Sequence, residues 1–325
     1  MKKPLYREAL HHGWRLAWEH KLLWLFGLFA AFLGQMGIME LVAQFSTASA
    51  DYTVVGIWDQ VRIVCSALQS ASLPLDGWAA LAWVGVILLG FGLFFVFVSV
   101  VSQGALIHSA AASTKRLKKK LPDTDKAWHA GVTHFWRLFF LNIVKKGILA
   151  LLIVLLGYVV HVAAESGSMA AAIMLGIIFV LLSIIGMIMS FWVIYAAGYV
   201  VVEEYTFIKS LKAAWKLFLS HKLVSLEVGV ILLACNVVLA AFVAGGLVLT
   251  VLEGILFWLV FNAMGVPGLF VIGTVLLAGI FFLFIMFAQS IFTVFTTTTW
   301  TYLFMKMHKK GIRSRLHGFW FHKKK

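Results

Sequence analysis

The sequence predicts an all-α, polytopic membrane protein built as a bundle of about six transmembrane helices. Hydrophobic residues make up 62% of the 325-residue chain and charged residues only 12%, whereas soluble domains carry about 25% charged residues. A water-soluble core cannot hide that much apolar surface, because a domain of this size needs polar side chains outside. In addition, six long apolar segments follow one another, with lysine and arginine concentrated on one side of them.

Each of the six segments reaches the ~20 apolar residues that a spanning helix needs. They cover roughly residues 22–44, 78–111, 138–164, 169–202, 223–252 and 266–305. A signal-peptide-like Ala48-Ser49-Ala50 follows the first segment, but the long amphipathic leader before it favours a true span. The last segment has no charge or proline after Pro267, which favours one unbroken helix. Residues 54–68 have helical periodicity and predict a short helix on the outer membrane surface.

The basic residues predict the orientation. With six spans and a cytoplasmic N-terminus, every lysine and arginine except Arg62 falls on the cytoplasmic side, including the dense cluster at 115–120. We therefore expect a multi-pass protein of the cell inner (plasma) membrane with both termini in the cytoplasm. The net charge of +14 then indicates anionic lipid headgroups as partners. No nucleic-acid-binding motif accompanies it, so nucleic acid is not expected.

Three stretches of the chain resemble one another, at residues 8–16, 130–138 and 209–217. Each has a small residue, then five positions later a tryptophan, then a basic residue and a leucine. Each predicts an amphipathic helix in the headgroup layer, with an apolar tryptophan face and a cationic face. Each leads into a span, an outer loop and a second, longer span that must tilt or project into the cytoplasm. We therefore expect one transmembrane domain, 1–325, of three repeat units, 4–111, 126–202 and 207–305, with a basic tail at 306–325.

The repeat provides candidate site residues. The predicted anionic-lipid contacts are Arg15, Lys21, Arg137, Lys212, Lys216 and Lys222, and the predicted interfacial aromatic residues are Trp14, Trp136 and Trp215. Polar residues on the second spans form a candidate cavity that opens to the cytoplasm: Gln103, His108, Tyr195, Tyr199, Gln289, Thr293 and Thr297. The alternative is that these residues hydrogen-bond between helices, or back to their own helix in the case of threonine.

Catalytic and ion-coupling signals are scarce. Apart from Glu40, near the outer end of the first span, Glu227 is the only carboxylate within a span. It lies about one turn from Lys222, and this scarcity of charge argues against a proton pump. No zinc-binding, phosphate-cradling or nucleophile motif occurs, so we expect no metal, no cofactor and no enzyme. Cys65 and Cys235 are expected to be free thiols.

Residues 201–219 carry a family resemblance. An acidic pair is followed by Ser210-Leu211 and then by Trp215-Lys216-Leu217 before a span. Here the chain resembles uncharacterised prokaryotic multi-pass membrane proteins, and it is similar to the membrane domain that accompanies some glycerophosphodiester phosphodiesterases. The resemblance covers mainly the third unit and, more faintly, the second. It implies a helical membrane fold without catalytic residues, because the soluble phosphodiesterase domain has no counterpart in this sequence.

Two functions remain open on the sequence alone. The first is a non-enzymatic scaffold or lipid-interacting protein held to the cytoplasmic leaflet by its cationic surface helices. The alternative is a transporter or channel for a small solute or lipid that uses the polar faces of the long second helices. The sequence leaves protein partners unknown.

Overall fold

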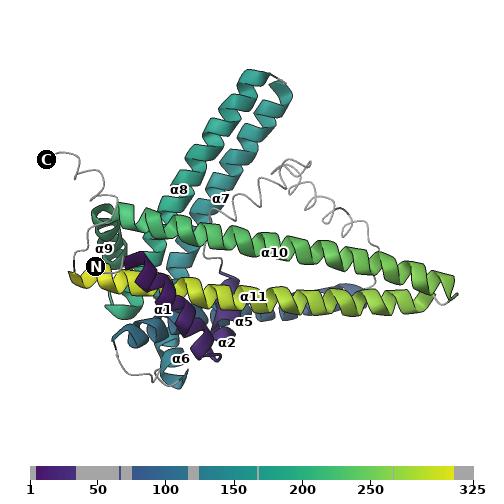
Figure 1. Cartoon of the computed structure of the whole chain (residues 1–325), viewed down its shortest axis with the longest axis horizontal. Helices are drawn as coiled ribbons and strands as arrows, with labels where there is room; N and C mark the ends of the chain where they lie inside the picture. Colours follow the sequence, from purple (N-terminus) through teal and green to yellow (C-terminus); the bar gives the residue numbers. More distant parts are fainter. Residues whose placement is uncertain are drawn as a thin grey trace. The chain divides into compact units, whose positions relative to one another are not determined.

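The computed structural model describes residues 5–33, 66, 75–115, 124–166, 168–265 and 267–310. Within these ranges the regular elements are all helices, which confirms the all-α fold class. They are α1 (Leu5–Glu19), α2 (Leu23–Ala31), α5 (Leu75–Lys115), α6 (Thr124–Thr133), α7 (Phe135–Ser166), α8 (Met169–Val202), α9 (Phe207–Ser220), α10 (Lys222–Ala263) and α11 (Pro267–Lys310) (Figure 1).

Five of these helices are long and apolar enough to cross a membrane: α5, α7, α8, α10 and α11. They coincide with the last five predicted spans, and α11 is one unbroken helix, as expected. The chain is therefore a multi-pass membrane protein. Of the first predicted span, α2 forms residues 23–31, and residues 34–44 lie outside the described part. Also outside it are the predicted outer helix at 54–68, apart from residue 66, the basic cluster at 116–120, and the tail beyond residue 310.

Burial divides each long second helix, α5, α8 and α11, into two parts. In α11 no residue from Leu269 to Gln289 is buried, whereas every residue from Thr293 to Thr301 is. The change occurs near residue 98 in α5 and near residue 190 in α8. At ~1.5 Å per residue, each exposed part is roughly 30 Å long, which matches the ~30 Å hydrocarbon core of a bilayer. The exposed parts are therefore suited to lipid, and each buried part is packed within the protein.

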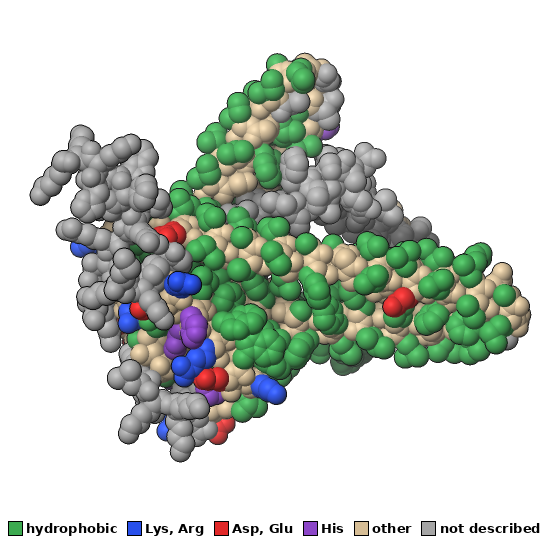
Figure 2. All heavy atoms as spheres, in the orientation of Figure 1, with side chains coloured by type: hydrophobic (Ala, Val, Ile, Leu, Met, Phe, Trp, Pro, Cys, Tyr) green, Lys and Arg blue, Asp and Glu red, His purple; other side chains and the backbone are tan. Residues whose placement is uncertain are grey.

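The chain forms two compact units. The first comprises Met1–Phe32, Ala105–Ala127 and Leu219–Lys325. In it α10 and α11 form a hairpin, and both α1 and α2 pack on α11. Gly13 of α1 comes so close to α11 that a Cβ atom there would overlap Thr299. In the first unit, hydrophobic side chains cover the visible face of the α10–α11 hairpin, whereas charged side chains and histidines gather where α1 lies (Figure 2).

The second unit comprises Leu33–Gly104 and Trp128–Phe218. Its α7–α8 hairpin is held by a leucine core of Leu149, Leu152, Leu156 and Leu182. The end of α6 lies against α5, where a Cβ atom on Gly104 would come within 2.8 Å of the Gly131 Cα. The helix α9 lies against α8, and Trp192 Nε1 of α8 donates a hydrogen bond to the Leu211 carbonyl oxygen of α9 at 2.8 Å. Each surface helix thus packs on a long second helix: α6 on α5, α9 on α8 and α1 on α11.

Candidate lipid-interface site

The three Trp-basic-Leu stretches each have a buried and an exposed side. The leucine is buried in every stretch, and so is the small residue five positions before the tryptophan: Leu16, Leu138, Leu217, Ala9, Gly131 and Ser210. The tryptophans are exposed: Trp14 by 56%, Trp136 by 66% and Trp215 by 42%. The buried side chains attach each stretch to the protein, which leaves an amphipathic indole ring for the surroundings. Such rings favour the membrane–water interface.

One detail differs from the sequence interpretation. In the second stretch, Trp136 does not lie on the surface helix, because α6 ends at Thr133 and Trp136 is in the first turn of α7. The two helices join without loss of backbone hydrogen bonds at His134, whose N–H donates to Ala130 and whose carbonyl accepts from Leu138. Periodicity alone could not locate so short a junction.

Aromatic pairs occur where the exposed part of each long second helix ends. The ring centroids are close in all three places: Phe97 and Phe135 at 4.9 Å, Trp192 and Trp215 at 5.8 Å, Trp24 and Phe287 at 5.0 Å. In the first unit a third aromatic ring, that of Trp18, has its centroid 5.7 Å from that of Trp24. Aromatic residues at the ends of an apolar span are typical of the headgroup level.

Four of the six predicted lipid-contacting cations project freely at the surface. Lys21, Lys212, Lys216 and Lys222 are all exposed. Arg15 is also exposed, but its Nε donates to Glu19 Oε1 at 2.8 Å, one turn along α1. An exposed ion pair of this kind contributes little to stability. These five side chains therefore remain accessible to an anion.

Arg137 has a structural partner instead. Its Nη1 donates to the carbonyl oxygens of Glu204, at 3.2 Å, and Tyr205, at 3.4 Å. These carbonyls lie just after the end of α8, where Glu204 adopts a left-handed backbone conformation with φ of 54°. That conformation is unfavourable for a residue other than glycine, and a cation is favourable at a helix C-terminus. Arg137 therefore stabilises the α8–α9 turn.

The predicted polar cavity is distributed over both units. Gln103, Tyr195 and Tyr199 belong to the second unit, and His108, Gln289, Thr293 and Thr297 to the first. All are at least partly buried except Gln289, which is exposed. Neighbouring hydroxyl groups bond to their own helix, since Thr296, Thr299 and Thr301 each donate to a carbonyl one turn back at 2.8 Å. A cavity lined by the seven residues remains a prediction.

The structure adds a polar contact that the sequence did not predict. Asn142 of α7 donates from Nδ2 to Gln103 Oε1 of α5 at 2.8 Å and to the Leu138 carbonyl at 2.9 Å. Lys145, one turn further along α7, is only 5% exposed. The sequence analysis counts Lys145 with the basic residues of the cytoplasmic side, although it falls within the predicted span 138–164. The only available signal was its position three residues after Asn142, on the same helical face.

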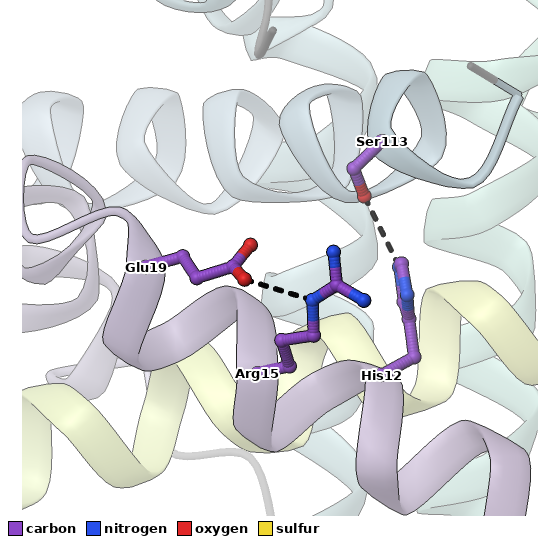
Figure 3. A network of polar contacts seen from close by, with 4 residues as sticks. All are labelled: His12, Arg15, Glu19 and Ser113. Atoms are coloured by element: carbon purple, nitrogen blue, oxygen red, sulfur yellow. Dashed lines mark hydrogen bonds and ion pairs between the residues drawn. The ribbon is translucent and has the colours of Figure 1, made fainter. Parts of the chain in front are cut away.

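A second polar cluster surrounds His12 in the first unit (Figure 3). His12 Nε2 lies 3.2 Å from Ser113 Oγ of α5, and the His12 ring centroid is 4.9 Å from that of Tyr302 on α11. Burial lowers the pKa of His12 below its ordinary value, and the nearby Arg15 lowers it further. The sequence places His12 on a surface helix but gives no signal for these partners, because they come from distant segments.

Comparison of the chain with protein-family models, with curated proteins and with solved structures finds no match. The arrangement above therefore has to be interpreted from its own chemistry. Among the described residues, no three histidine, cysteine, aspartate or glutamate side chains gather as a metal site would require. The resemblance to phosphodiesterase-associated membrane domains stays a prediction.

Proposed function

We propose that the chain is a non-enzymatic, lipid-interacting scaffold of the cell inner (plasma) membrane, with both termini in the cytoplasm. One observation carries the proposal: each long second helix has an exposed apolar part of bilayer length that ends at an aromatic pair. Beyond that pair the helix is packed against a surface helix, and the exposed tryptophan of the stretch lies on that helix or, after α6, in the first turn of α7. The surface helices then lie at the cytoplasmic headgroup level and hold anionic lipids.

The depth of the polar residues favours a scaffold over a transporter. Transporters hold substrates near the bilayer midplane. Here Gln103, Tyr199 and Thr297 follow the exposed apolar parts of their helices, on the side where the surface helices pack. By this proposal they belong to the packed parts of their own units beyond the hydrocarbon core, where hydroxyl and amide groups stabilise helix contacts.

The packing of the surface helices supports three equivalent units. α6 and α9 each pack on the long helix that precedes them in the chain, and α1 packs on the last long helix, α11. This is the pattern expected of repeats whose surface helices contact the preceding unit in cyclic order. The proposal also includes the likeness to phosphodiesterase-associated membrane domains, which implies a membrane fold without catalytic residues.

The proposal is tested by lipid selectivity. Lys212, Lys216 and Lys222 are exposed on neighbouring parts of α9 and α10, and basic residues near a membrane surface contribute up to about 1 kcal/mol each towards anionic lipid. Electron paramagnetic resonance of spin-labelled phosphatidylglycerol and phosphatidylcholine around the reconstituted chain measures their relative association. We expect a preference for phosphatidylglycerol that weakens in high salt and falls severalfold when all three lysines become glutamine.

The matched control replaces the same three lysines with arginine, which keeps the charges. That variant should retain the preference for phosphatidylglycerol. A wild-type protein without any preference, or a glutamine variant that keeps it in full, would contradict the proposal.

The runner-up function, a transporter or channel, is favoured by the buried polar group of Gln103, Asn142 and Lys145. Polar and charged side chains inside a helix bundle are costly and often mark a substrate path. After Cys65 and Cys235 are replaced with serine, a single cysteine at Tyr195 distinguishes the two functions. Reaction of that cysteine with an impermeant thiol reagent added from outside the cell indicates a water-filled path through the bilayer. The scaffold predicts no reaction.

A further inference from the structure

Around His12, three helices bring polar groups together within one unit. Ser113 comes from α5, and Arg15 lies on α1 beside His12 (Figure 3). Tyr302 and Lys306 come from α11. Lys306 Nζ is 5.2 Å from the centroid of the Tyr302 ring, which itself contacts the His12 ring. The Tyr302 hydroxyl donates to Glu8 Oε2 at 3.3 Å.

Among the residues that the structure describes, Arg15 has one hydrogen-bonded donor, its Nε. Its Nε bonds to Glu19 Oε1 at 2.8 Å. Figure 3 shows the two terminal nitrogen atoms of the guanidinium on the side away from Glu19, towards His12 and Ser113. Paired guanidinium N–H groups match the oxygens of a phosphate in geometry.

The hydrogen bonds of Ser113 fix the tautomer of His12. The hydroxyl proton of Ser113 is donated to the Ala110 carbonyl at 2.8 Å, so Ser113 Oγ can only accept from His12 Nε2. A serine hydroxyl has one proton to donate, and the proton of neutral His12 is therefore on Nε2. Protonation at Nδ1 would add both a positive charge and a second N–H donor.

Surrounding charges oppose that protonation in the ligand-free protein. Burial and the charge of Arg15 lower the pKa of His12, and the charges of His11 and Lys306 lower it further. Among these influences, Glu19 alone raises it. Ser113 from α5 and Tyr302 from α11 present hydroxyl groups, and Glu8 is bound to Tyr302. An anion placed between Arg15 and Lys306 would offset their repulsion and favour the protonated imidazole.

We propose that His12, Arg15 and Lys306 bind the phosphate of one anionic phospholipid, and that His12 takes up a proton when the headgroup binds. A lipid fits better than a soluble phosphate because Trp14 and Trp18, on the same helix, are 56% and 46% exposed with ring centroids 5.6 Å apart. Exposed indoles beside a phosphate site are suited to the acyl–headgroup boundary. The inference rests on the lipid-interacting function proposed above and assigns it one specific, pH-dependent site.

Native mass spectrometry of the full chain in a neutral detergent tests the site. Dissociation constants for the first bound phosphatidylglycerol are measured at pH 7.5 and pH 5.5, since this phosphodiester stays anionic throughout. We expect wild type to bind the lipid about tenfold more tightly at pH 5.5. The reason is that a difference of one unit between the His12 pKa of the lipid-bound and of the lipid-free protein corresponds to a factor of ten in affinity. His12→Gln should bind equally at both pH values.

The arginine and its control decide whether the site is specific. Arg15→Gln should weaken binding about tenfold at both pH values, and Arg15→Lys, at an exposed position that tolerates exchange, should restore most of the affinity. Lys306→Gln should weaken binding similarly. Lys126→Gln removes the same charge from an exposed position on α6, outside the cluster and outside the predicted lipid contacts, and should have little effect on the first bound lipid.

Each contrary result has a distinct meaning. If Lys126→Gln weakens binding as much as Arg15→Gln, or His12→Gln keeps the pH response, the specific site is refuted while the general lipid-interacting function stands. Equal binding of phosphatidylglycerol and phosphatidylcholine by wild type refutes both. Inorganic phosphate that binds as tightly as phosphatidylglycerol overturns the assignment to a lipid.

Discussion

Replacing Gly131 with alanine tests the contact between a surface helix and a long second helix. A Cβ atom at this position would come within 3.0 Å of the Val101 carbonyl carbon and of Val101 Cγ1, and closer still to the Val101 carbonyl oxygen. On the other side of the contact, a Cβ atom on Gly104 would be 2.8 Å from the Gly131 Cα. Since backbone atoms are involved on both helices, no side-chain rotation relieves the overlap.

The expected loss follows from two opposing effects. Overpacking a close contact costs about 1–3 kcal/mol, and backbone atoms that cannot move place this case towards the upper end. Alanine is favoured over glycine in a helix by about 1 kcal/mol. The net expectation for Gly131→Ala is therefore a loss of roughly 2 kcal/mol in the free energy of unfolding.

Equilibrium unfolding in mixed micelles, with a non-ionic detergent titrated by dodecyl sulfate and followed by circular dichroism, measures this loss. The control is Gly147→Ala in α7, where no atom lies within 4 Å of an added Cβ. It should raise stability by up to about 1 kcal/mol. Equal stability of the two variants would show that α6 does not pack on α5, and the reasoning about surface helices would fail with it.

Three further predictions concern the surface helices, measured by thermal unfolding in a neutral detergent. Leu217→Ala should cost about 2–5 kcal/mol because the side chain is buried, whereas Trp215→Ala should cost clearly less; similar losses would contradict an outward-facing indole. Arg137→Gln should cost about 1 kcal/mol through loss of its bonds to the α8–α9 turn, and an unchanged melting temperature would remove that role. The folded-state pKa of His12 lies below its ordinary value, so below that ordinary value the unfolded chain binds more protons than the folded one. The free energy of unfolding should therefore be highest above about pH 6.5 and should decrease as the pH falls towards the folded-state pKa. His12→Gln should flatten that decrease, and an identical slope would exclude His12 as its source.

The membrane-spanning helices could be predicted because the signal is local. A run of apolar residues has to be helical in lipid, where each backbone group must be satisfied within its own segment. The spans from 169–202 and 266–305 therefore match α8 and α11 closely, even though neither has an amphipathic pattern. The exposure of the tryptophans was predictable from equally local information. An indole that follows a small residue and precedes a basic one has few suitable environments other than the membrane surface.

Contacts between distant segments were not predictable from local patterns. Nothing near Arg137 indicates that the α8–α9 turn, 67 residues away, supplies its acceptors, so the sequence assigned it to lipid. The pairing of Asn142 with Gln103 and that of His12 with Ser113 depend in the same way on where separate helices come together. Burial also decided which part of each apolar-rich helix faces outward and which is packed, a distinction that composition does not record.

The sequence by itself determined that this protein belongs in a membrane, because hydrophobicity and the spacing of basic residues can be assessed for one helix at a time. Only the tertiary structure decided which polar side chains are partners. A hydrogen bond requires two groups about 3 Å apart, and that proximity depends on how the helices pack rather than on their order in the chain.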